Sequence, residues 1–116
     1  MFSYENLRVY KKAFDANRKV YRMLKENKVI PSYTKNQLGR ASLSIMLNIA
    51  EGSAKFSDRH RRNFYITARG SVFECASLVT FLYGEGEMVA NLKDELRTTY
   101  EEISKILFTM IKNLKR

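Results

Sequence analysis

Residues 64–82 read FYITARGSVFECASLVTFL, and this stretch carries the clearest pattern in the chain. Apolar or small residues recur in it at alternating intervals of four and three positions: Phe64, Ala68, Ser71, Cys75, Leu78 and Leu82. Because an α-helix completes a turn every 3.6 residues, these residues share one face. The stretch therefore predicts a long amphipathic helix that buries this face against other helices.

Three further segments, at about residues 5–27, 33–52 and 89–114, show the same helical periodicity. Each repeats apolar or small residues on one face, and no segment alternates as a β-strand does. Tyr10, Phe14 and Tyr21 widen the apolar stripe of the first segment. The three stripes are Val9, Ala13, Ala16, Val20 and Met23; Leu38, Ala41, Ile45 and Ile49; and Leu92, Leu96, Thr99, Ile103, Ile106, Met110 and Leu114.

Helix-breaking and helix-capping residues separate the segments. Pro31 interrupts the first pattern, Gly52 is a natural C-terminal stop for the second, and Ser57 is a good N-cap for the third. The run Gly84-Glu85-Gly86 ends the third helix. Three short connections between four long helices favour an all-α, antiparallel up-down-up-down four-helix bundle, with residues 1–116 forming a single domain.

Positive charge is concentrated in the first part of the chain. The net charge is +9, and residues 1–69 hold 15 Lys and Arg against 5 Asp and Glu, whereas residues 70–116 hold 6 against 7. Such an excess suggests a polyanionic partner, although it is also compatible with a solubilising surface. The predicted nucleic-acid contacts are Lys11, Arg18, Arg22 and Lys25 in the first helix and Lys55, Arg59, His60, Arg61 and Arg62 around the second connection.

The chain lacks the residue patterns of common enzymes. It has one histidine and one cysteine, His60 and Cys75, and contains no phosphate-binding loop, dinucleotide fingerprint or Cys/His metal cluster. We therefore expect no catalytic residues, metal or cofactor. No apolar run approaches the roughly 20 residues that a membrane span requires. The lone cysteine and the absence of a signal-peptide pattern lead us to expect a cytoplasmic protein.

Polar residues lie close to the apolar stripes of the two central helices. Arg40, Ser44, Asn48 and Glu51 share one face of the second helix, and Arg69, Ser71 and Glu74 lie at a similar level of the third. A pairing of Arg69 with Glu51, and of Asn48 with Ser71 or with a backbone carbonyl, would form a buried polar cluster that fixes the register of the helices. A binding or catalytic role is the alternative. Gly70, in the middle of a helix, predicts close approach of a neighbouring helix or subunit.

A second set of apolar residues lies off the main stripes of the last two helices. One explanation of this set is a wide apolar face that is buried in the core. The other is a subunit interface, because large apolar patches rarely stay exposed on monomers. The residues are Ile66, Phe73, Phe81, Tyr100, Leu107 and Ile111.

Two sequence words in the central helices resemble a known family. NIAEG at residues 48–52, followed by F-x-x-x-A-x-G-S-x-x-E at residues 64–74, is similar to the bacterial 23S rRNA intervening-sequence proteins. The resemblance implies a four-helix bundle assembled as a ring-shaped homopentamer. A related four-helix group serves as accessory protein to the reverse transcriptase of diversity-generating retroelements, which favours RNA over DNA as the ligand. We thus expect a non-enzymatic RNA-binding homo-oligomer; the alternative is an adaptor that holds a protein partner.

Overall fold

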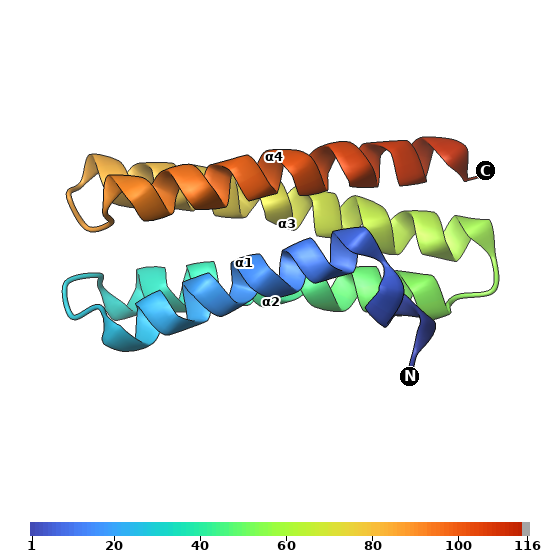
Figure 1. Ribbon diagram of the computed structural model, residues 1–116, viewed down its shortest axis with the longest axis horizontal. Helices are drawn as coiled ribbons and strands as arrows, with labels where there is room; N and C mark the ends of the chain where they lie inside the picture. Colours follow the sequence, from blue (N-terminus) through green and yellow to red (C-terminus); the bar gives the residue numbers. More distant parts are fainter. Residues whose placement is uncertain (115–116) are drawn as a thin grey trace.

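The computed structural model describes residues 1–114 and consists of four long helices. They are α1 (Arg8–Glu26), α2 (Ser32–Ala54), α3 (Asp58–Gly84) and α4 (Ala90–Asn113), preceded by a short 3-10 turn at Ser3–Asn6. Consecutive helices run in opposite directions, so that both ends of the chain lie at the same end of the bundle (Figure 1). The predicted all-α four-helix fold is confirmed.

The helices pack as a closed square. α1 packs against α2 and α4, and α3 packs against the same two helices, which places α1 and α3 at opposite corners. The molecule is elongated, with extents of 44 × 25 × 22 Å. One face of every helix is therefore buried, and the outer faces of the helices form its long surfaces.

The core contains most of the predicted stripe residues. Val9, Ala13, Ala16 and Val20 of α1 are buried, as are all four stripe residues of α2. The buried face of α3 is rotated from the predicted one, because α3 contacts both α2 and α4 and its core face points between them. The most buried residues of α3 are consequently Tyr65, Ala68, Val72, Cys75, Val79 and Leu82, whereas Phe64, Ser71 and Leu78 are only partly buried.

Two aromatic residues at the edge of the α1 stripe were assigned incorrectly. Phe14 and Tyr21, expected to widen the core stripe of α1, are exposed. Tyr100 and Leu107 of the second apolar set lie in the core, in agreement with the wide-core explanation. The physical reason is that a flanking position is buried only where a neighbouring helix lies over it.

The helix boundaries show why Gly52 is a glycine. α2 continues to Ala54, so Gly52 is not the stop that its sequence position suggests. It is buried, and a Cβ atom there would lie only 2.7 Å from Cε1 of Tyr65. Ser57 does cap α3 as predicted, because its Oγ accepts a hydrogen bond from the backbone N–H of His60 at 3.2 Å. Gly86, with a φ of 74°, adopts the left-handed conformation just beyond α3.

Within residues 1–114, none of the helices combines the length and apolar character needed to cross a lipid bilayer.

Candidate nucleic-acid interface

The four predicted basic residues of α1 form a row along its outer face. Their spacing of seven, four and three positions keeps them on one side of the helix, opposite the buried stripe. All four are exposed, and in residues 1–114 none of them forms an ion pair. The row, which we call the α1 basic row, consists of Lys11, Arg18, Arg22 and Lys25.

Two other lysines of α1 have their charge offset by α4. Nζ of Lys12 lies 3.0 Å from Oε2 of Glu102, and Nζ of Lys19 lies 3.6 Å from Oε1 of Glu95. Both pairs are partly solvated, so each contributes at most about 1 kcal/mol to stability. Their main consequence is electrostatic: the flank of α1 that faces α4 is neutralised. The α1 basic row keeps an excess of positive charge, although Asp15 lies beside Arg18 and Arg22.

The second basic group lies at the end of the bundle, where α2 passes into α3 (Figure 1). Arg61 Nε donates a hydrogen bond to the carbonyl oxygen of Lys55 at 2.6 Å, and Nζ of Lys55 lies 5.0 Å from the ring centroid of Phe64. His60 Nδ1 lies 2.7 Å from Oγ of Ser57. Arg59 and His60 are exposed, whereas Arg61 and Arg62 are partly buried. The predicted nucleic-acid contacts thus fall into two groups in different parts of the bundle.

The predicted polar cluster is present in a smaller form, centred on Ser44. Asn48 Nδ2 donates to the carbonyl oxygen of Ser44 at 2.8 Å and to its Oγ at 3.0 Å. Ser71 Oγ donates to the same Oγ at 2.8 Å, which joins α3 to α2. Each of these partly buried bonds contributes about 0.5–1.5 kcal/mol. The cluster fixes the relative position of the two helices, and none of its members carries a charge.

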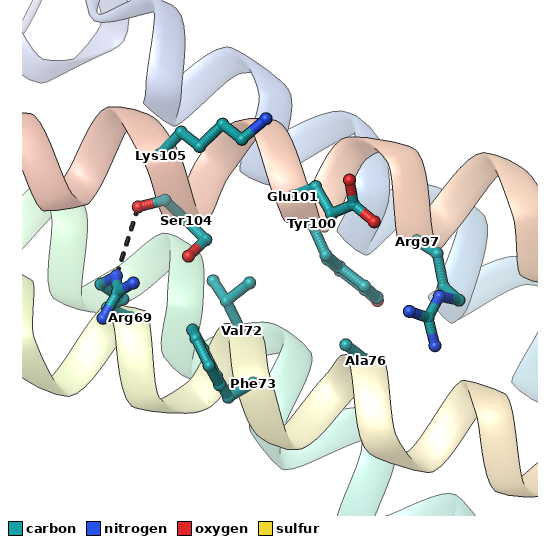
Figure 2. A pocket seen from close by; sticks show the side chains of 9 residues that line it. All are labelled: Arg69, Val72, Phe73, Ala76, Arg97, Tyr100, Glu101, Ser104 and Lys105. Carbon is teal, nitrogen blue, oxygen red and sulfur yellow. Dashed lines mark hydrogen bonds between the residues drawn. The ribbon is translucent and has the colours of Figure 1, made fainter.

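The prediction that Arg69 forms an ion pair with Glu51 is wrong. Arg69 points towards α4, where its Nε donates to the carbonyl oxygen of Ser104 at 3.3 Å (Figure 2). Its guanidinium carbon lies 4.9 Å from the ring centroid of Phe73 and 5.4 Å from that of Phe108. Glu51 is exposed on α2. The two residues face different neighbours because the side of α3 that carries Arg69 is turned towards α4.

Arg40 and Glu74 also lie outside the polar cluster. Both are exposed, and Glu74 Oε2 accepts a hydrogen bond from Gln37 Nε2 at 2.7 Å. Charged groups rarely stay buried without a partner, and here each of them is exposed to solvent. Arg40 instead lines a groove between α1 and α2.

A cavity of about 520 Å³, which no sequence pattern predicts, lies between α3 and α4. Arg69, Arg97, Lys105 and Glu101 supply its charged groups, so its cations are partly offset by a carboxylate. The ring of Tyr100 lies between the two helices at this level (Figure 2), and within residues 1–114 the Cys75 thiol is the only polar partner of its buried hydroxyl. Among the same residues, no cluster of three His, Cys, Asp or Glu side chains is placed to hold a metal ion.

Cys75 is buried beside Tyr100 in the core. Burial raises the pKa of the Cys75 thiol to about 12, and the neighbouring Tyr100 hydroxyl offsets only part of this effect. Burial likewise raises the pKa of Tyr100. Since the thiolate is the reactive form of cysteine, Cys75 is a poor nucleophile at neutral pH.

We expect the folded protein to resist thiol alkylation. At pH 8.5, iodoacetamide should modify Cys75 much more slowly in the native chain than in urea, because the native thiol is both buried and protonated. The rate, followed by mass spectrometry, should rise about tenfold per pH unit below the pKa of the thiol. It should therefore level off above about pH 9 in the unfolded chain, whereas in the native chain it should still be rising there. Equal rates in the two states at pH 8.5 would show that the thiol is accessible and not perturbed.

The sequence model of the 23S rRNA-intervening sequence protein matches residues 5–109, which is most of the chain. The chain belongs to this family. Both sequence words that carry the resemblance, at residues 48–52 and 64–74, lie within the match and on the facing helices α2 and α3.

A solved structure of the same architecture supports the fold of this family member. It is a crystal structure of a protein of unknown function from the S23 ribosomal protein family of Bacteroides thetaiotaomicron. The similarity covers 90% of this chain and 99% of that one, with a TM-score of 0.83 and 20% sequence identity. At this identity the likeness concerns the fold alone. No match was found among curated proteins.

Proposed function

We propose that this member of the 23S rRNA-intervening sequence protein family is a non-enzymatic, RNA-binding homo-oligomer of the cytoplasm. The observation that carries the proposal is the α1 basic row, whose four cations are exposed and form no ion pair in residues 1–114. Lysine and arginine side chains in such positions bind phosphates and release counterions. The name of the family favours RNA as the polyanion. The basic connector between α2 and α3 supplies a second group of phosphate contacts.

An exposed apolar stripe on α3 supports the oligomer. Ile66, Phe73 and Phe81 are exposed on this helix, and Phe108 of α4 is exposed near Ile66 and Phe73. Gly70 lies between Ile66 and Phe73, and a Cβ atom there would meet no atom within 4 Å. A glycine in an exposed apolar stripe leaves room for a neighbouring backbone to approach closely. We take the subunit number, five, from the rings that the family resemblance implies.

The same stripe supports the alternative function, that of an adaptor for a protein partner such as a reverse transcriptase. An adaptor requires the apolar stripe but not the α1 basic row or the basic connector. Dependence of binding on these cations therefore separates the two functions.

Replacing Arg59, Arg61 and Arg62 together by glutamine should flatten the salt dependence of binding to an RNA duplex. If each arginine contacts one phosphate, the slope of log K against log salt should fall by about 3. Fluorescence anisotropy across a salt series measures this slope, and circular dichroism checks the fold, which should survive because the three residues lie outside the apolar core.

The matched control replaces Lys93, Arg97 and Lys105 by glutamine, which removes the same charge from α4. Lys93 is paired with Asp94 at 2.8 Å, Arg97 Nη1 donates to Thr80 Oγ1, and Lys105 lines the α3/α4 cavity together with Glu101. All three belong to α4 and lie outside both groups of predicted phosphate contacts. We expect the slope of log K against log salt for this control variant to stay close to the wild-type slope. If the affinity for RNA depends neither on salt concentration nor on Arg59, Arg61 and Arg62, the result would favour the adaptor function.

A further inference from the structure

A groove of about 460 Å³ lies between α1 and α2, on the side of the bundle away from the α3/α4 cavity. Its charged residues are Lys25, Lys35 and Arg40, and no carboxylate lines it. The α3/α4 cavity differs in this respect, because Glu101 stands among its cations. The α1/α2 groove is therefore positive as well as concave, which favours an anionic ligand.

An aromatic ring stands exposed at the edge of this groove. Tyr21 is 56% exposed, and Nζ of Lys25 lies 4.5 Å from its ring centroid. Lys35 is held in place because its ammonium group donates to the carbonyl oxygen of Asn27. Phe14, two turns before Tyr21 on α1, is exposed on the same side. Aromatic rings interleaved with cations provide stacking and phosphate contacts together.

The remaining lining suits the base of a nucleotide. Leu24 and Gly39 form an apolar floor, and a Cβ atom at position 39 would lie 3.6 Å from Cδ1 of Leu24. Asn17 and Asn36 add two carboxamides, which both donate and accept hydrogen bonds, as the edges of bases do. Only an unpaired base can offer its face to Tyr21, because the bases of a duplex are stacked on one another.

We propose that the α1/α2 groove binds an unpaired nucleotide of a single-stranded RNA segment. The base stacks on Tyr21, and the adjoining phosphates bind Lys25 and Arg40. The rest of the strand follows the α1 basic row towards Arg18 and Lys11. This inference rests on the proposed RNA-binding function and adds the site and the strandedness of the ligand.

The test replaces Tyr21 by leucine and measures binding of a short fluorescein-labelled polyuridine strand by anisotropy. Loss of one stacked base should weaken binding by about 5- to 150-fold. Tyr21→Phe and Tyr21→Trp, which keep a ring, should bind like the wild type. Binding of a labelled RNA duplex should change little in all three variants, because a duplex offers no base face to the ring.

Tyr83→Leu is the matched control. Tyr83 is also an exposed tyrosine with a lysine ammonium over its ring, since Nζ of Lys93 lies 4.3 Å from the centroid, but it lies near the end of α3, away from the groove. Its replacement should leave the affinity for the single strand unchanged.

Two outcomes would overturn the inference. One is that Tyr21→Leu binds polyuridine as tightly as Tyr83→Leu does. The other is that Tyr21→Leu weakens binding of the single strand and of the duplex by the same factor. In that case wild-type binding of RNA still stands. If the wild-type protein binds neither the polyuridine strand nor the RNA duplex, the proposed function is overturned, and the assignment of the groove with it.

Discussion

Replacing Gly52 by alanine should destabilise the folded chain by about 1–3 kcal/mol, the usual cost of overpacking a core. The change runs against helix propensity, because alanine is favoured over glycine within a helix by about 1 kcal/mol. The new Cβ would lie 2.7 Å from Cε1 of Tyr65 and 3.0 Å from Cβ of Phe64. Tyr65 cannot easily move away: it is 5% exposed, and its hydroxyl lies 3.2 Å from Oγ of Ser53.

Gly39→Ala is the control for this prediction, in the same helix. A Cβ at position 39 would make an ordinary 3.6 Å contact with Leu24, so this variant should be as stable as the wild type or more stable by up to about 1 kcal/mol. Urea unfolding followed by circular dichroism gives both free energies of unfolding. Equal stability of the two alanine variants would mean that α2 and α3 do not approach as closely as described.

Replacing Phe73 by glutamate should dissociate the oligomer. Phe73 is 56% exposed on the apolar stripe of α3, and Arg69 stacks on its ring. In an assembly that covers this stripe, the glutamate and the neighbouring Arg69 would both lose water, and the desolvation of a buried ion pair can exceed the attraction between its charges; in a monomer the glutamate would be solvated. Analytical ultracentrifugation at micromolar concentration should give several times the chain mass of 13.6 kDa for the wild type. The variant should sediment as a single chain.

Phe56→Glu introduces the same change at another exposed phenylalanine, in the connector between α2 and α3. This control should keep the wild-type mass. A wild-type protein that sediments as a monomer would contradict the proposed oligomer, and so would a Phe73→Glu variant that retains the full mass.

The fold was predictable because helical periodicity depends only on the order of the residues. The stripe from Val9 to Val20 was placed in the core correctly, and the Ser57 cap marked the start of α3. Residues at the edges of a stripe were harder to assign. Tyr21 and Tyr100 both flank apolar stripes, yet one is exposed and the other is buried. Their burial depends on the rotation of each helix against its neighbours, and periodicity does not determine that rotation.

The candidate site was predictable only in part, for the same reason. The sequence identified the exposed cations of the α1 basic row and the bond of Asn48 to a backbone carbonyl. It did not show that Asn48 and Ser71 are connected through Ser44, and its prediction that Arg69 faces Glu51 was wrong. Gly52 and Gly70 both interrupt helices, and only the packing shows that the first is tightly enclosed and the second is open. The α1/α2 groove could not be predicted because its residues come from two helices and most of them lie outside the apolar stripes.

The measurement that tests the central claim most directly is the affinity of the wild-type protein for single-stranded RNA at 50 and 200 mM salt. If the four cations of the α1 basic row each neutralise one phosphate, binding should weaken by about 50-fold over this range, because each contact on a single strand contributes about 0.7 to the logarithmic slope. Affinity that is undetectable at 50 mM salt, or that stays constant between the two concentrations, would contradict RNA binding through phosphate contacts.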